Sequence, residues 1–174
     1  LGGGNDNLTL NLGNDIVQGT NGQLDQNDTV AGGTGTDTIK YTDASTVRDS
    51  DFTNVTSVEA VTMVGDFAGT FTLGANASTA GITSLTFTDL DTADTVTVGA
   101  GFASNLTVNI AAAASALNTV NAAAYTKVLT ISANAISLDT TTSVLTGGTG
   151  TSDVLSLTGS LNTTIVTTSI SGIE

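Results

Sequence analysis

Short runs in which apolar residues alternate with threonine or serine recur along the chain. Such period-two patterns are typical of strands that bury one face, and the abundant threonine, valine and isoleucine favour a pleated surface. Leu85, Val96 and Leu106 follow one another at steps of 11 and 10 residues, a spacing that fits either a β-solenoid or a β-sandwich. The pattern predicts strands at 85–88, 95–98, 106–110, 129–131 and 154–157.

One stretch near the N-terminus carries a stricter pattern. Residues 32–40, Gly-Gly-Thr-Gly-Thr-Asp-Thr-Ile-Lys, fit Gly-Gly-x-Gly-x-Asp-x-U-x, with U a large apolar residue, at every constrained position. Glycines let the backbone turn with positive φ and approach a cation closely. The Asp37 carboxylate is a hard oxygen ligand that suits Ca²⁺. Thr38–Lys40 should form a minimal strand that points Ile39 inward.

Three further aspartates stand in phase with Asp37. Asp6 and Asp15 are nine residues apart, as are Asp28 and Asp37. A step of 13 separates Asp15 from Asp28 and indicates a loop insertion at 23–26. Two glycines of the pattern are missing at residues 10–11. Each aspartate is followed two positions later by an apolar residue, which is Leu8, Val17, Val30 or Ile39.

This series resembles the nonapeptide repeats of RTX proteins, a family of secreted bacterial proteins. In that family two nonapeptides form one coil, and calcium lies between successive coils at the Gly-x-Asp turns. The resemblance implies a calcium-binding β-roll over residues 1–45, with Asp6 and Asp28 on one side and Asp15 and Asp37 on the other. The calcium ligands that it implies come from Gly3, Asn5, Asp6, Gly13, Asp15, Asp28, Gly33, Gly35 and Asp37.

A second repeat operates on a longer scale. Residues 147–151 copy residues 32–36 after 115 positions, and the correspondence continues without a gap to Glu174, which matches Glu59. A fixed offset with apolar positions in phase, such as Val154 with Ile39, indicates a repeated structural module. We therefore expect slightly more than one unit of a longer array.

The second copy departs from the first at one position. Ser152 occupies the slot of Asp37, and Asp153 is displaced by one residue. We expect this copy to keep the turn, and its calcium binding stays open. The whole chain is then predicted to be all-β: a calcium-binding β-roll (1–45), an irregular right-handed parallel β-solenoid (46–145), and the start of the next module (146–174).

Other segments leave alternatives open. The alanine-rich stretch at 111–117 is either a short helix, which alanine favours, or a narrow part of the solenoid. The segment 43–60 is expected to hold a helical turn or a looped coil. Asp49 and Asp51 are expected to be solvated turn carboxylates, as aspartate often is. A second candidate calcium site lies between two strands, at Asp89, Asp91 and Asp94.

The composition narrows the function. Sixteen acidic residues face three basic ones, for a net charge of −13. Nucleic-acid binding needs a basic footprint and is excluded, and docking on an anionic membrane is disfavoured. Such an excess of one charge destabilises a compact state unless cations compensate. No cysteine is present for a disulfide, and the longest apolar run is far short of the roughly 20 residues of a membrane span.

No catalytic group stands out. The chain has no histidine, so a serine–histidine or cysteine–histidine pair is impossible. A carboxylate pair for glycoside hydrolysis would need a cleft and aromatic side chains for sugar stacking. Five phenylalanines, two tyrosines and no tryptophan give that activity little support. We expect the phenylalanines to lie in the core and the chain not to be an enzyme.

Motifs and composition together resemble the surface-layer (S-layer) proteins of alphaproteobacteria that carry RTX repeats. The resemblance implies a secreted, structural segment that calcium stabilises and assembles into a homo-oligomeric lattice on the cell surface. A cell-surface polysaccharide would be bound through another domain. The alternative is a stalk module of a large RTX adhesin or biofilm matrix protein. A calcium-binding tail of an RTX enzyme or toxin is disfavoured, because such tails carry uninterrupted nonapeptides.

Overall fold

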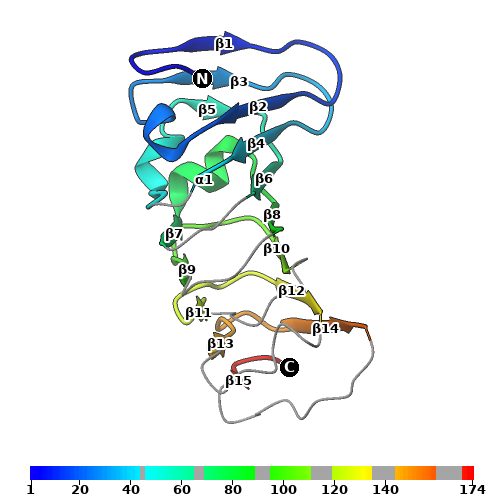
Figure 1. Cartoon of the computed structure of the whole chain (residues 1–174). Coiled ribbons are helices and arrows are strands. Elements are labelled where there is room, and N and C mark those ends of the chain that lie inside the picture. The colour runs from blue at the N-terminus through cyan, green and yellow to red at the C-terminus, as the bar shows by residue number, and fades with distance from the viewer. Residues whose placement is uncertain (44–45, 65–68, 89–94, 111–118, 135–143, 160–169) are drawn as a thin grey trace.

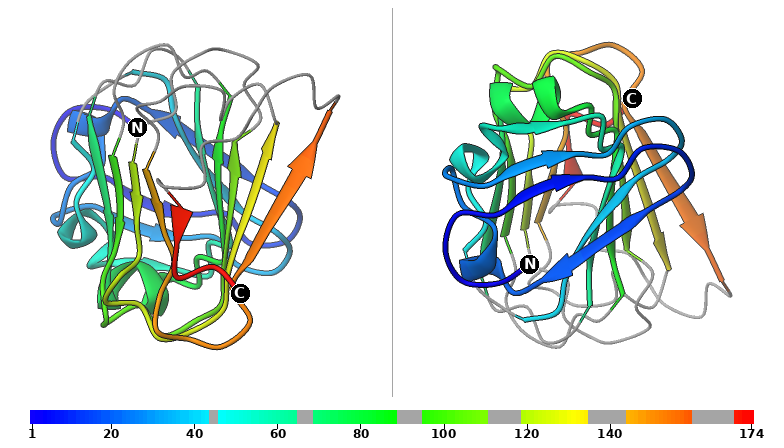
Figure 2. Two further views of the ribbon diagram at one scale, coloured as in Figure 1. Left: turned by 90° about the horizontal axis from the view of Figure 1, so that it is seen from below. Right: turned by 90° about the horizontal axis from the view of Figure 1, so that it is seen from above.

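The chain winds into a parallel β-solenoid, with successive coils stacked along one axis and the two termini at opposite ends of the stack (Figure 1). This computed structural model describes residues 1–43, 46–64, 69–88, 95–110, 119–134, 144–159 and 170–174. All strand pairs within these residues are parallel. The view along the axis shows strands of successive coils superimposed on the walls of the solenoid (Figure 2).

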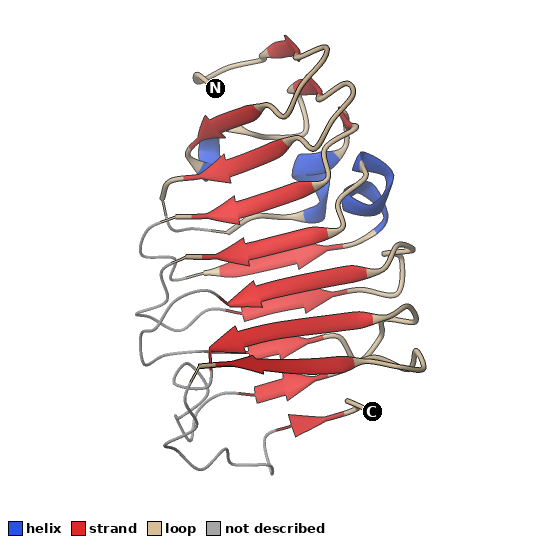
Figure 3. Cartoon of the chain, turned by 90° about the vertical axis from the view of Figure 1, so that its right-hand side faces the viewer, coloured by secondary structure: helices blue, strands red, loops and turns tan. Residues whose placement is uncertain are grey.

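The strands form three sheets. The longest has seven strands and runs almost the full length of the molecule (Figure 3). Its strands, in spatial order, are β2 (Ile16–Gly19), β4 (Thr38–Tyr41), β6 (Ala60–Met63), β8 (Ser84–Phe87), β10 (Leu106–Ile110), β12 (Leu129–Asn134) and β14 (Val154–Thr158).

The remaining strands form two shorter sheets. The N-terminal part is a three-stranded sheet of β1 (Asn7–Thr9), β3 (Thr29–Ala31) and β5 (Val55–Thr56). The rest is a five-stranded sheet of β7 (Thr70–Leu73), β9 (Thr95–Val98), β11 (Thr119–Asn121), β13 (Val144–Thr146) and β15 (Ile170–Ser171).

Strict alternation along the strands builds the core. In β6, β8 and β9 every second residue is buried, and the residues between them, mostly threonine and serine, face outward. The register between strands then stacks apolar residues on apolar residues: Val61 pairs with Leu85, and Leu85 pairs with Val108. The interior is a column of aliphatic side chains. Phe52 and Phe71 add an aromatic contact with ring centroids 6.2 Å apart, and Phe102 and Tyr125 add another at 5.9 Å.

Three short helical segments interrupt the coils within the described residues. They are two 3₁₀ turns, η1 (Asn21–Gln23) and η2 (Asp49–Phe52), and one α-helix, α1 (Ala75–Ala80), which packs against η2. Alanines supply the helix propensity of α1. Gly81, with φ of 104°, ends it in the left-handed region that glycine adopts without strain.

The structure confirms the predicted fold class as a nearly all-β parallel solenoid and rejects the sandwich alternative. Each predicted strand is present, Ile39 points inward, and η2 is the helical turn expected within 43–60. Four phenylalanines, at 52, 71, 87 and 102, lie in the core as predicted. Helix α1 was not anticipated. Phe67 and the stretch at 111–117 lie outside the described residues.

The alternation on β12 gives a direct test of the core. Ile131 is fully buried, whereas its neighbour Thr130 faces outward. We expect Ile131→Ala to lower the free energy of unfolding by about 2–5 kcal/mol, because it leaves a cavity between coils. Thr130→Ala, the matched control, should change it by about 0.5 kcal/mol or less. Urea unfolding followed by circular dichroism measures both, and equal effects would contradict the assigned register.

Candidate metal site

The aspartates of the repeat form a ladder of hydrogen bonds between coils. The backbone N–H of Asp6 donates to Asp28 Oδ1, and that of Asp15 donates to Asp37 Oδ1, each at 2.8 Å across 22 residues. The ladder continues where the N–H of Asp37 donates to Glu59 Oε2, also at 2.8 Å. Asp6 therefore stacks on Asp28, and Asp15 on Asp37, in the two columns that the resemblance to nonapeptide repeats implied.

Glycines allow the coils to approach at these corners. A Cβ added at Gly33 would lie 2.0 Å from the carbonyl oxygen of Asn11, and one at Gly35 would lie 2.0 Å from that of Gly13. At Gly32 it would lie 1.9 Å from the carbonyl oxygen of Ser57 and 2.6 Å from Asp37 Oδ2. The missing side chains leave room for carbonyl and carboxylate oxygens to gather beside Asp37.

The two columns differ in how the second carboxylate oxygen is used. In the first column it accepts a backbone N–H of its own turn: Gly2 donates to Asp6 Oδ2 at 2.9 Å, and Asp25 donates to Asp28 Oδ2 at 2.7 Å. In the second column, Oδ2 of Asp15 and Oδ2 of Asp37 are buried without a hydrogen-bond partner. Buried polar atoms are rarely left unpaired, so these two oxygens are the candidate cation ligands of the described corners.

These residues fit a calcium ion. Calcium takes six to eight oxygen ligands and accepts backbone carbonyls as readily as carboxylates. The Asp15 and Asp37 carboxylates, together with nearby carbonyl oxygens of the glycine turns, supply ligands of that kind. No group of three or more acidic side chains converges within the described residues, so most ligands of such a site would come from the backbone.

The other predicted ligands are placed less favourably or lie elsewhere. Gly3 and Asn5 are exposed on the first coil. Gly13 adopts a φ of 122°, as the turn requires. Where a glycine is missing from the pattern, Asn11 takes a φ of 70°, a left-handed conformation that asparagine tolerates better than most residues. Asp89, Asp91 and Asp94 lie outside the described residues, so their calcium site stays a prediction.

The predicted insertion at 23–26 forms a closed corner. Strand β2 leads into η1, whose C-terminal neighbour Leu24 is fully buried in the core. The side chain of Asp25 then accepts the backbone N–H of Asn27, and the carboxylate of Asp28 accepts that of Asp25. The extra residues thus satisfy the Asp28 carboxylate from within the turn.

The second copy rebuilds the corner with Asp153. The N–H of Leu129 donates to Asp153 Oδ1 at 2.8 Å, and the N–H of Ser152 donates to Glu174 Oε2 at 2.6 Å. Ser57 and Gly172, which are 115 residues apart, both adopt positive φ. Ser152 absorbs the one-residue displacement with a φ of 81°. Unlike Asp37, Asp153 has both oxygens paired, because the N–H of Gly148 donates to Oδ2 at 2.7 Å.

The displacement corrects one sequence correspondence. Val154 was matched to Ile39, but it is 43% exposed, and Leu155 is the residue that stacks on Ile131 in the core. The 115-residue offset therefore slips by one residue after Ser152 and is restored by Gly172.

Asp49 and Asp51 are structural acceptors rather than solvated turn residues. The Asp49 carboxylate accepts the N–H groups of Gly74, Asn76 and Ala77 and so caps α1 from the neighbouring coil. Asp51 accepts the N–H of Arg48 at 2.8 Å.

Burial raises the pKa of Asp51, and burial together with the Asp51 charge raises the pKa of Tyr41 well above its ordinary value. Burial also raises the pKa of Tyr125 to about 12.

Sequence reasoning missed two contributors to these corners. Asn14 Oδ1 accepts the N–H of Thr36 at 2.8 Å, again across 22 residues, and Asp49 caps a helix that was not predicted. The 22-residue interval that relates Asp15, Asp37 and Glu59 would have revealed the ladder. The carboxylates of Glu59 and Glu174 both accept a backbone N–H from the preceding coil.

Comparisons of the chain with protein-family models, curated proteins and solved structures find no match. Among the described helices, none has the length and apolar character needed to cross a membrane.

The unpaired oxygens lead to a test with matched variants. We expect 10 mM calcium to raise the free energy of unfolding by about 1.4–2.7 kcal/mol, if the dissociation constant is about 10⁻³ to 10⁻⁴ M as in extracellular modules. Asp37→Asn should abolish this response. Asp28→Asn should keep it and lose about 1–3 kcal/mol in chelator, because an amide N–H would then oppose the N–H of Asp25.

Urea unfolding in calcium and in chelator measures both terms. If the two variants lost the calcium response equally, the ion could not be assigned to the Asp15–Asp37 column.

Proposed function

We propose that the chain is a structural, non-catalytic segment of a secreted bacterial S-layer protein that calcium stabilises and helps to assemble. The observation that carries the proposal is the pair of buried, unpaired carboxylate oxygens at Asp15 and Asp37. They lie in glycine turns whose sequence resembles RTX repeats. A protein that meets calcium only after export would have a use for such turns.

The calcium role follows from the charges at the corners. Asp15 and Asp37 stack on adjacent coils, about 4.8 Å apart in a parallel ladder, and their like charges repel. A bound calcium would neutralise both and join the coils through the surrounding carbonyl oxygens. Asp37 also holds the Asp15 N–H, so its orientation is fixed whether or not the ion is present.

The shape supports a structural role. Because the termini lie at opposite ends of the solenoid (Figure 1), further modules can stack end to end without a change in direction. The corner at 32–37 reappears at 147–153 with the same pairing to a following glutamate. A chain of such modules forms a rod, since each repeat contacts only its neighbours.

The same extended shape favours one alternative function. A stalk module of a large RTX adhesin or biofilm matrix protein also needs a rod that separates its two ends. The two functions differ in lateral contacts: an S-layer module must associate side by side, whereas a stalk works as a single rod.

Calcium-dependent association separates these functions. Neutralised carboxylates reduce the repulsion of a −13 chain, so we expect calcium to shift sedimentation from monomer to larger species and to yield sheets in negative-stain micrographs. Magnesium at equal ionic strength is the control for screening. Extended monomers in both calcium and chelator would contradict the S-layer assignment and support the stalk.

Local folding of the first coils gives a second test. We expect amides of residues 1–40 to be protected from hydrogen exchange in millimolar calcium and to exchange rapidly in chelator, because ligand binding couples to folding. The amides of β8, β10 and β12, which lie two or more strands beyond β4 in the seven-stranded sheet, are the internal control and should stay protected. Protection of residues 1–40 that is independent of calcium would contradict the proposed stabilisation.

A further inference from the structure

The acidic residues are absent from the sheet faces. None of the described strands contains an aspartate or glutamate, although the chain carries sixteen of them, and Lys40 is the one charged residue in these strands. The acids among the described residues lie instead in the segments between or flanking the strands. Two such molecules repel least when they meet through their sheets, so the faces are where another copy can approach.

The outer face of the seven-stranded sheet has two rows of side chains. Strand register defines the first row as Ile16, Thr38, Ala60, Ser84, Thr107, Thr130 and Val154. It defines the second row as Gln18, Lys40, Thr62, Thr86, Asn109, Ser132 and Ser156.

The first row has an exposed aliphatic residue at each end. Ile16 on β2 is 66% exposed, and Val154 on β14 is 43% exposed. Between them the residues are small, and Ser84 on β8 occupies the centre. The row is therefore close to symmetric about β8, with threonine next to each end, at Thr38 and Thr130.

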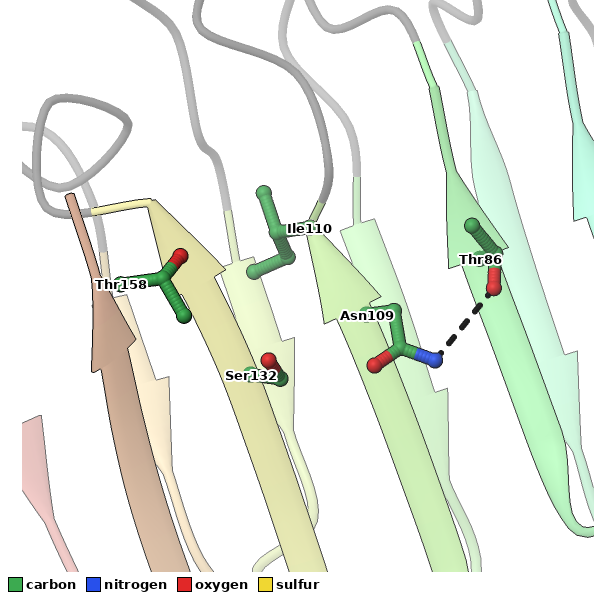
Figure 4. A pocket seen from close by; sticks show the side chains of 5 residues that line it. All are labelled: Thr86, Asn109, Ile110, Ser132 and Thr158. Atoms are coloured by element: carbon green, nitrogen blue, oxygen red, sulfur yellow. Dashed lines mark hydrogen bonds between the residues drawn. The ribbon is translucent and has the colours of Figure 1, made fainter.

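The second row carries a projection and a hollow. The side chain of Lys40 makes no hydrogen bond or ion pair with the described part of the chain. Three strands away is a pocket of about 350 Å³, lined by Thr86, Asn109, Ile110, Ser132 and Thr158 (Figure 4). Its hydroxyl and amide oxygens can accept hydrogen bonds from an ammonium group, whereas Ile110 is only 2% exposed and adds little apolar surface.

We propose that this face is a self-association surface, on which two copies pack about a two-fold axis running along β8 so that Lys40 of each enters the pocket of the other. The inference rests on the proposed function, since it names the lateral contact that an assembling module requires. The axis reverses the order of strands in the second copy and keeps each row opposite itself. An isologous contact of this kind closes on itself.

A two-fold axis in the plane of the face can run either along β8 or along the solenoid, and the geometry favours the axis along β8. With the axis along β8, Ile16 meets Val154 of the second copy at both ends, and Lys40 lies opposite Ser132 in the pocket wall. With the axis along the solenoid, the first row would meet the second, placing Ile16 against Gln18 and Lys40 against Thr38. Only the first arrangement pairs aliphatic with aliphatic and fills the pocket.

The contact is small and therefore weak. Seven strands at about 4.8 Å and two rows about 7 Å apart give an area on the order of 400 Å² per copy, roughly half that of a stable complex. A single module should dimerise only at high concentration. In an array the same contact repeats and gains avidity.

Cysteine cross-linking tests the arrangement, because the chain has no cysteine of its own. Ser84 is on β8, so the two-fold axis places Ser84 of one copy opposite Ser84 of the other. Ser84→Cys in the full chain should therefore form a disulfide-linked dimer on oxidation in calcium. Thr107→Cys is the matched control. Its two copies would lie about 10 Å apart, beyond the reach of a disulfide. A mixture of Thr107→Cys with Ala60→Cys should cross-link, because these residues face each other.

Further variants decide between the possible outcomes. Lys40→Gln in the Ser84→Cys background should slow dimer formation about tenfold or more, because two charge-assisted hydrogen bonds are lost. Thr97→Cys, on the five-stranded sheet, reports random collision. Ser84→Cys that cross-links no faster than Thr97→Cys would overturn the proposal. Preferential linkage between Ser84→Cys and Thr86→Cys would overturn the axis in favour of the one along the solenoid.

The result also separates this surface from the proposed function. If calcium still produced larger species by sedimentation while Ser84→Cys failed to cross-link, the assembly would stand and this interface would be wrong. If Ser84→Cys cross-linked equally well in chelator and sedimentation showed no response to calcium, the interface would stand and calcium-driven assembly would be wrong.

Discussion

The structure depends on hydrogen bonds between consecutive coils, which must repeat at nearly constant chain length. At the corners this ladder is extended by side chains: a carboxylate of one coil accepts the backbone N–H of the coil before it, 22 residues earlier. Where a glutamate replaces aspartate, as at Glu59, the longer side chain still reaches the same donor. Coil length, glycine position and acid position must therefore match one another, since a shift in any of them separates the backbone N–H from the carboxylate that accepts it.

This constraint explains why acidic side chains lie at the turns and hydroxyl side chains lie on the strands. Acids are useful at the turns, where their carboxylates accept hydrogen bonds from backbone N–H groups of the preceding coil. On the strands they would stack in register at about 4.8 Å from coil to coil and repel. Threonine and serine avoid that repulsion and suit the pleated surface. The described strands consequently carry no acid and a single charge, that of Lys40, although the molecule is strongly acidic, and lateral contacts can form where repulsion is least.

The sequence predicted the solenoid because both of its periodicities are local. Alternation located strands such as β9 and β10, and the resemblance of the aspartate series to nonapeptide repeats placed Asp6 over Asp28 and Asp15 over Asp37. Helix α1 was missed, because its cap comes from Asp49 on the preceding coil, which no local pattern reveals. The register at Val154 was missed for a similar reason. The slip is absorbed by the backbone of Ser152, and a serine gives no sign that it will adopt positive φ.

The two copies of the glycine corner show that the second oxygen of the buried aspartate can be satisfied in two different ways. Asp37 and Asp153 both hold the N–H of the preceding coil, and both lie beneath glycines that admit a neighbouring carbonyl oxygen. One extra residue before Asp153 brings its Oδ2 onto the N–H of Gly148, whereas Asp37 Oδ2 has no such donor. A backbone N–H thus does at the second corner what we propose a cation does at the first. An array of these modules would then contain corners that respond to calcium and corners that hold without it, so that loss of the ion loosens particular coils and leaves the rod between them intact.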